Sequence, residues 1–399
     1  MRILIIHNIL WAHYKASVFQ ALQQAVDQHP GITLKVLQIA RNERSRAGLE
    51  TAVADGTAPT YTYNYELLFD RFLEDVSLAD RTRALLRAVR AFKPDVINLT
   101  GYYDPAQQLL LLWANANGVR VVMQSESTMA DQQRGGWKDQ LKRWLLSRCD
   151  GFFCFGNQSA DYLIKLGVPP EKVLMRKNAV DNESLRAVFE KALPTRSSQQ
   201  QALGLRPNNI VFVGRLIGVK NLPMLVTAFA EARKRSLAAA SWGLIMLGDG
   251  AEQDRLTAQI QSLGLADAVH ILPGRPWFQV PQVLALSNVL ALPSRSEPWG
   301  LVVNEAMACG LPVIVSNRCG CVPDLVHDRR NGFVFDPDEP NQLVEQLTGF
   351  MNGSVDIDRM SRLAEASVIS YAPDAVAREM LDGFRRVVLR SSKAAHFSA

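Results

Sequence analysis

The chain has 399 residues, of which 48% are hydrophobic and 21% are charged, a composition typical of soluble globular proteins and unlike disordered, collagenous or coiled-coil chains. This length predicts two or three domains, each with a core of its own. The net charge of +5 is too small for a typical nucleic-acid-binding surface. No apolar run approaches the roughly 18–20 residues that cross a bilayer.

Short apolar runs alternate with stretches of helical periodicity along the first half of the chain. The apolar runs predict buried strands at residues 2–7, 33–40, 95–100, 119–124, 151–155 and 172–176. Helical periodicity marks residues 15–28, 81–92 and 137–147. Strands and helices that alternate in this way form a parallel sheet covered by helices on both faces. We therefore expect a Rossmann-like domain over residues 1–190.

A polar, turn-rich stretch at 185–201 interrupts this pattern and predicts a linker at 191–207. The alternation then starts again. Further strands are predicted at residues 209–213, 243–247, 269–272, 289–292, 312–316 and 332–335, and helices at 222–235, 252–263, 277–285, 304–308 and 341–350.

These elements predict a second Rossmann-like domain over residues 208–372, followed by a helix at 373–399 that returns to the first domain. The fold class is thus α/β, with two doubly wound parallel sheets facing each other. Ligands of such sheets bind beyond the carboxyl ends of the strands, and the cleft between two facing domains is the expected site.

Residues 293–312 follow the order strand, loop, helix, glycine stop and strand. Gly300 relieves crowding where the chain enters the helix, so the amides of Gly300, Leu301 and Val302 can point N–H groups toward an anion. A phosphate or diphosphate suits that position. Glu297 before the helix and Glu305 within it can flank such a ligand and accept sugar hydroxyls. Alternatively, Glu305 only complements the helix dipole and Glu297 is solvated.

A second segment places two cations directly after a strand. The strand ends at Gly214, and Arg215 and Lys220 follow before the next helix. Two cations at this position can neutralise a leaving diphosphate, although an isolated Arg and Lys in a loop are more often solvated. The glycine-rich turn at 248–250 is a weak signal when taken alone.

Together, these segments resemble the retaining glycosyltransferases of family 4, which have the GT-B fold. The resemblance covers residues 210–335. It rests on Gly214 and Arg215 with Lys220, on Gly248, Asp249 and Gly250, on the run Leu272, Pro273, Gly274 and Arg275, and on Glu297 and Glu305 as the ends of the family's E-x7-E motif.

The resemblance implies a role for each of these residues. Arg215 and Lys220 would bind the diphosphate of a nucleotide-sugar donor, Glu305 its ribose, and Glu297 the hydroxyls of the transferred sugar. Gly214 and the turns at 248–250 and 272–275 would border the nucleotide, with Arg275 near the base. The resemblance implies no metal and no cofactor besides the nucleotide-sugar co-substrate.

The first domain resembles the family less closely. Residues 7–15 replace the Gly-Gly pair that many members carry after the first strand, and Lys15 there is a candidate for a phosphate or an acceptor anion. Where members often have a histidine near the reacting sugar, this chain has residues 124–128, so Glu126 is the candidate acceptor-side catalytic residue. Residues 100–104 are candidates for lining the acceptor pocket. Helix capping and packed tyrosines are the alternative explanations.

Residues 134–146 combine four basic residues with Trp137, Leu141, Trp144 and Leu145 at helical spacing. Such a helix can lie on an anionic membrane, although Trp and Leu stripes more often belong to a core. The mild excess of cations in the first half agrees with an anionic surface as a partner.

Metal sites and disulfides are not expected. The five cysteines are odd in number and scattered, which favours a reducing, cytoplasmic setting. If the segment at 134–146 docks on a membrane, the location would be the inner face of the cytoplasmic membrane. Cys319 and Cys321 lack a second pair at zinc spacing. Asp336 and Asp338 imitate the Asp-x-Asp of metal-dependent transferases, but their position favours ordinary turn chemistry.

The sequence therefore predicts a retaining, metal-independent glycosyltransferase with a sugar or lipid-linked sugar acceptor, in bacterial surface polysaccharide or glycolipid synthesis. Three alternatives on the same fold remain open: a disaccharide phosphorylase, a sugar-nucleotide epimerase, and a nucleotide-sugar-binding protein without turnover.

Overall fold

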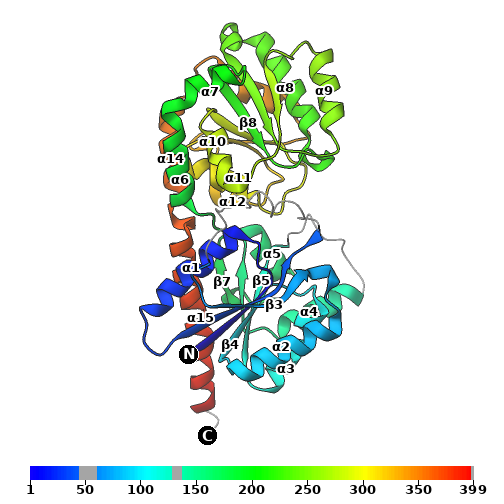
Figure 1. The fold of residues 1–399 in the computed structure, drawn as a ribbon, viewed down its shortest axis with the longest axis vertical. Coiled ribbons are helices and arrows are strands. Elements are labelled where there is room, and N and C mark those ends of the chain that lie inside the picture. The colour runs from blue at the N-terminus through cyan, green and yellow to red at the C-terminus, as the bar shows by residue number, and fades with distance from the viewer. Residues whose placement is uncertain (45–60, 128–136, 397–399) are drawn as a thin grey trace. The chain divides into compact units, whose positions relative to one another are not determined.

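The computed structural model describes residues 1–44, 61–127 and 137–396, which fold as two compact units (Figure 1). Unit 1 comprises Met1–Ala179 together with Tyr371–Ala399, and unit 2 comprises Val180–Ser370. The first unit thus ends before the expected boundary at 190, and the last helix belongs to it. None of the described helices is both long and apolar enough to cross a bilayer.

Unit 1 is built on a parallel sheet of seven strands in the order β3-β2-β1-β4-β5-β6-β7. The strands are β1 (Arg2–Ile9), β2 (Thr33–Asn42), β3 (Tyr65–Phe72), β4 (Val96–Leu99), β5 (Arg120–Ser125), β6 (Gly151–Cys154) and β7 (Val173–Arg176). The edge strand β3 was not expected. It is largely exposed and carries charged residues, so it lacks the apolar run that marks the buried strands.

Helices cover both faces of this sheet. They are α1 (His13–Asp27), α2 (Leu78–Phe92), α3 (Pro105–Ala116), α4 (Trp137–Ser147), α5 (Asn157–Lys165) and α15 (Pro373–His396). One apolar cluster packs α2, α3 and α5 on one face, and a second packs α1 and α15 on the other. In the second cluster Phe384 of α15 meets Phe153 of β6 edge to face, with ring centroids 5.1 Å apart.

Unit 2 has a parallel sheet of six strands in the order β10-β9-β8-β11-β12-β13. The strands are β8 (Asn208–Val213), β9 (Trp242–Leu247), β10 (Val269–Leu272), β11 (Val289–Leu292), β12 (Val313–Ser316) and β13 (Gly332–Phe335). The two sheets confirm the predicted pair of doubly wound α/β folds. The strand order reverses between β8 and β11, which is the point where ligands bind in such folds.

Unit 2 begins with two helices that were not expected, α6 (Asn182–Ala192) and α7 (Arg196–Ala202). Its further helices are α8 (Leu222–Arg235), α9 (Gln253–Ser262), α10 (Val280–Leu284), α11 (Leu301–Ala308), α12 (Val322–Leu325), α13 (Pro340–Met351) and α14 (Ile357–Val368). The stretch expected as a linker, 191–207, is therefore mostly helical. Asp181 caps α6, and the buried Gln200 donates to the carbonyls of Pro207 and Leu286, so this segment is anchored in unit 2.

Candidate functional site

The loops after β8 and β9 lie side by side at the carboxyl edge of the unit 2 sheet. The Gly214 amide donates to the Leu247 carbonyl at 3.0 Å, and the Leu216 amide donates to the Asp249 carbonyl at 2.9 Å. Gly248 has a φ of +146°, and a Cβ at this position would lie 2.0 Å from the carbonyl oxygen of Gly214. Only glycine permits this approach.

The turn after β9 also holds the loop after β10. The Asp249 carboxylate accepts a hydrogen bond from the Gly274 amide at 2.9 Å, and a Cβ on Gly250 would lie 2.2 Å from the carbonyl oxygen of Leu216. Asp249 therefore fixes one loop against another, in addition to the donor-binding role expected for it. Arg275 follows in the anchored loop and is half-buried.

Helix α11 starts at Leu301, three residues before the expected start at 304. Its N-cap residue is Gly300, with a φ of +95°, and a Cβ there would lie 3.1 Å from Leu292 and 3.3 Å from Glu297. The indole of Trp299 donates to Asn304 at 2.7 Å and pins this entry. Amides in a first helical turn have no acceptor within the helix, and the binding of an anion by the amides of Gly300, Leu301 and Val302 stays a prediction.

Lys220 and Glu297, which come from different segments of the sequence, form an ion pair in the structure. Their side chains are only 15% and 17% exposed. The pair joins the short helix after β8 to the loop that leads into α11. A cation and a carboxylate thus stand together beside the start of α11.

The loop after β12 supports Glu297 through the backbone, a role that the sequence did not reveal. The Glu297 amide donates to the Arg318 carbonyl at 3.3 Å, and the Glu297 carbonyl accepts from the Gly320 amide at 2.9 Å. A Cβ on Gly320 would lie 1.9 Å from the Pro298 carbonyl oxygen, so Gly320 permits this close approach. The glycine between Cys319 and Cys321 was the available signal.

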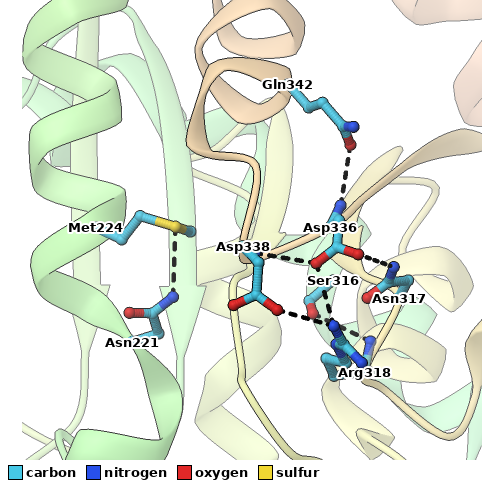
Figure 2. Close-up of polar contacts among 8 residues, drawn as sticks. All are labelled: Asn221, Met224, Ser316, Asn317, Arg318, Asp336, Asp338 and Gln342. Carbon is cyan, nitrogen blue, oxygen red and sulfur yellow. Dashed lines mark hydrogen bonds and ion pairs between the residues drawn. The ribbon is translucent and has the colours of Figure 1, made fainter.

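Asp336 and Asp338 bind a side chain of the protein itself. Figure 2 shows the Arg318 guanidinium between them, 3.4 Å from Asp336 Oδ1 and 2.9 Å from Asp338 Oδ2. Asp336 also accepts from Asn317 at 3.1 Å and from the Asp338 amide at 3.0 Å. Over the described part of the chain, no group of three or more His, Cys, Asp or Glu residues is placed to hold a metal ion.

Two further donor-site candidates differ in their electrostatic state. Burial raises the pKa of the Glu305 carboxyl, in the middle of α11, to about 7. Arg215 lies exposed after β8, and within residues 1–44, 61–127 and 137–396 its guanidinium makes no hydrogen bond or ion pair. Arg215 is therefore available to an incoming anion, whereas Lys220 is already paired.

The acceptor-side candidates of unit 1 gather around one cavity. Lys15, Thr100, Tyr102, Tyr103 and Glu126 all line it. Asp104 does not line the cavity. Its carboxylate caps α3, where it accepts a hydrogen bond from a free amide of the helix start, and it pairs with Arg81 at 3.2 Å. Thr128 lies outside the described residues.

Helix α4 divides its apolar residues between the core and solvent. Leu141 and Trp144 are 41% and 42% exposed, whereas Leu145 is buried. The stripe expected for membrane contact therefore does not include Leu145. Residues 134–136 of that segment lie outside the described residues.

Two protein families match most of the chain between them. Residues 23–179 match the glycosyl transferase 4-like domain, and residues 195–367 match the glycosyl transferases group 1.

Curated relatives are about 30% identical to this chain over the aligned stretch, which is about half of the chain. A D-inositol 3-phosphate glycosyltransferase of Segniliparus rotundus is 29% identical over 198 residues, covering 48% of this chain and 43% of the relative. The protein of the same name from Corynebacterium jeikeium is 32% identical over 187 residues, covering 46% of this chain and 42% of the relative. The match thus spans less than half the length of these relatives.

Solved structures resemble the chain along nearly its whole length. Anabaena HepE in complex with UDP has a TM-score of 0.74 at 19% identity and covers 97% of this chain and 100% of its own. The lipopolysaccharide outer core galactosyltransferase WaaB has a TM-score of 0.68 at 16% identity, covering 97% and 99%. Sucrose-phosphate synthase of Thermosynechococcus elongatus has a TM-score of 0.73 at 17% identity, covering 98% and 100%. These likenesses confirm the predicted GT-B fold.

Proposed function

The chain belongs to the family 4 glycosyltransferases of GT-B fold, and from this membership we propose that it transfers a sugar from a nucleotide-sugar donor to a hydroxyl group of an acceptor. The proposed transfer retains the anomeric configuration and uses no metal ion. The observation that carries the proposal is the ion pair of Lys220 and Glu297 beside the start of α11.

The donor's diphosphate would bind where three sources of positive charge converge. Arg215 and Lys220 follow β8, and the start of α11 follows β11, at the strand-order reversal of the sheet. A diphosphate arriving there would compete with Glu297 for Lys220, which would release the Glu297 carboxylate to accept hydrogen bonds from the sugar. Binding of the diphosphate would thus free both side chains for their roles, Lys220 to contact the diphosphate and Glu297 to contact the sugar.

The reaction would proceed through an oxocarbenium-like anomeric carbon as the diphosphate departs. Fixed cations and helix amides stabilise the charge that develops on the leaving oxygen, and such groups need no reorganisation in the transition state. The leaving oxygen could take the proton of the acceptor hydroxyl on the same face of the sugar, so that the acceptor replaces the diphosphate with retention.

The named structural neighbours support a uridine nucleotide as the first donor to test. Anabaena HepE has been solved with UDP and with UDP-glucose. We extend this donor class to the present chain as a proposal. The acceptor would be a sugar or lipid-linked sugar of a bacterial surface polysaccharide or glycolipid at the inner face of the cytoplasmic membrane, with α4 as the membrane contact.

The experiment that tests the proposal measures release of free nucleoside diphosphate. The protein is incubated with UDP-, GDP- and ADP-sugars, each with and without a mixture of sugar acceptors. We expect one nucleotide class to give time-dependent release that Lys220→Ala reduces. Binding of a nucleotide sugar without release under any acceptor would contradict transfer and favour a non-catalytic binding protein.

A further inference from the structure

Unit 1 contains a cavity of about 250 Å³ at the carboxyl ends of β1, β4 and β5. This edge of a parallel sheet is where a ligand is expected. The proposed donor site lies in unit 2, so this cavity is the candidate acceptor site. The inference therefore rests on the proposed function and concerns the chemical class of that acceptor.

Lys15 is a buried cation at this cavity whose charge is already matched. Its side chain is 8% exposed, and its Nζ lies 3.4 Å from the Glu126 carboxylate and 3.3 Å from the ring centroid of Phe155. A carboxylate and an aromatic face both stabilise an ammonium group that has little water around it. The Glu126 side chain is 59% exposed, so Glu126 is the solvent-facing member of the pair.

The other polar groups around the cavity are uncharged or negative. His7 is buried against Ile9 and Gln38, and burial lowers its pKa to about 4, so that it is neutral near pH 7. Glu43 adds a second carboxylate to the lining. Among the described lining residues, Lys15 is consequently the one cation at neutral pH.

Hydroxyl and aromatic groups complete the lining. The hydroxyl groups of Tyr102, Tyr103 and Ser127 lie within 3.2 to 3.3 Å of one another. Tyr103 is 61% exposed, and its ring packs against that of Tyr102 with centroids 4.5 Å apart. Aromatic faces and hydroxyl donors are the groups that contact the C–H faces and hydroxyls of sugars.

We propose that this cavity binds an uncharged sugar or polyol, and that the Lys15–Glu126 pair excludes acceptors that carry a phosphate group there. A phosphate close enough to bind Lys15 would also lie close to the Glu126 carboxylate, and like charges at this range repel each other. Removing the charge of Glu126 would leave the charge of Lys15 unmatched and reverse the preference. Lys15 and Glu126 are thus specificity-determining residues as a pair.

The test compares one polyol with and without phosphate. Calorimetric titrations of myo-inositol and of inositol 3-phosphate are made into the wild-type chain, Glu126→Gln, Lys15→Met and the double variant. We expect the wild type to bind inositol 3-phosphate no more tightly than inositol. We expect Glu126→Gln to bind inositol 3-phosphate about tenfold more tightly than the wild type does, and the double variant to lose this gain.

A matched control removes a paired lysine elsewhere in the same sheet. Lys35 of β2 pairs with Glu66 at 2.6 Å and does not line the cavity. Lys35→Met should leave the preference unchanged. Thermal melting of every variant reports whether it folds. If Lys15→Met, a substitution at a buried position, does not fold, the titrations of Glu126→Gln are sufficient for the test.

Each outcome decides the inference. A wild type that binds inositol 3-phosphate at least tenfold more tightly than inositol overturns it. If the wild type binds neither compound, a gain in Glu126→Gln supports it and no gain contradicts it. A parallel titration with UDP tests the proposed donor site separately. If UDP does not bind, the proposed function is contradicted, whereas the charge preference of this cavity can still be measured.

Discussion

Glu305 lies in helix α11 with a carboxyl group largely removed from water. Burial raises its pKa from the ordinary 4.5 to about 7. Burial disfavours the charged form, so the carboxyl is protonated in the folded protein below pH 7 and ionised above it. A ribose hydroxyl donates more strongly to the ionised form. Donor binding should therefore depend on pH through this group.

We expect the affinity for a nucleoside diphosphate to rise between pH 6 and pH 8, by up to about tenfold for a single proton. Glu305→Gln should flatten this profile, which calorimetry at several pH values can measure. An unchanged profile in the variant would mean that Glu305 is not the titrating group.

The same shift has a consequence for stability with the opposite sign. The folded pKa lies above the unfolded value, so the free energy of unfolding decreases as pH rises from about 4.5 through 7. The rise in melting temperature that Glu305→Gln causes should therefore be larger at pH 8 than at pH 5. An equal change at both pH values would contradict this.

Lys220 forms its ion pair with Glu297 at the start of α11. Lys220→Ala should lower turnover by about a hundredfold or more, because a fixed donor at a developing charge is typically worth that factor. Steady-state release of nucleoside diphosphate measures this. Lys234→Ala removes a surface lysine paired with Glu231 and serves as the control. Similar turnover in both variants would argue against the role of Lys220.

Gly248 allows the loops after β8 and β9 to touch. Gly248→Ala combines an unfavourable φ with a contact of 2.0 Å to the Gly214 carbonyl, so it should cost about 3 kcal/mol or more. Gly264→Ala is the matched control, since its φ of +66° is also positive but nothing lies within 4 Å of the new Cβ. It should cost about 1–2 kcal/mol. Chemical denaturation measures both, and equal costs would contradict the close loop approach.

Among the elements, the strands that are buried on both faces of a sheet were predicted from their apolar runs. Strands such as β4 and β11 are buried at every position and were expected from their sequence. The edge strand β3 was missed because half of its residues face solvent. Helices α6 and α7 were missed because their exposed polar residues resemble a linker, while the features that fix them, the Asp181 cap and the buried Gln200, depend on the folded structure.

The candidate site shows the same division. The sequence placed Lys220 and Glu297 in one site, but it gave them separate ligands and did not show that they pair. The backbone support of Glu297 by the loop after β12 depends on tertiary contacts between segments about twenty residues apart, and Gly320 was its one local signal.

Helix α4 leads to a prediction about membranes. Leu141 and Trp144 face solvent, and Arg148 lies over the Trp144 ring at 4.8 Å from its centroid. If α4 contacts a bilayer, Trp144→Ala should reduce sedimentation with anionic phosphatidylglycerol vesicles several-fold at low salt. Leu263→Ala, an exposed leucine of unit 2, is the control. Absence of wild-type binding at low salt would remove the membrane proposal.

For the whole molecule, the alternation of strands and helices was sufficient to predict two Rossmann-like units. The position of the boundary between the units could not be predicted, because only Val180 and Asp181 separate Ala179, the end of the first segment of unit 1, from α6. The final helix was expected to return to the first domain, and α15 indeed belongs to unit 1, where it packs along α1. The core of unit 1 therefore contains residues of both the first and the last helix of the chain, α1 and α15.

Because α15 packs in the core of unit 1, a substitution in this helix should destabilise the fold of the first half of the chain. Phe384 of α15 is fully buried against Phe153. Phe384→Ala should cost about 3–5 kcal/mol. Hydrogen exchange should show faster opening of β6 and α1 while β8 and β9 are unaffected. Faster exchange confined to unit 2, or none in unit 1, would contradict the assignment of α15.

The most direct test of the account is a crystal structure of the chain with UDP bound. We expect the diphosphate at the carboxyl edge of the unit 2 sheet, in contact with Arg215, Lys220 and the first amides of α11, with the Lys220–Glu297 pair opened. A diphosphate bound away from these three groups, with that pair intact, would contradict it.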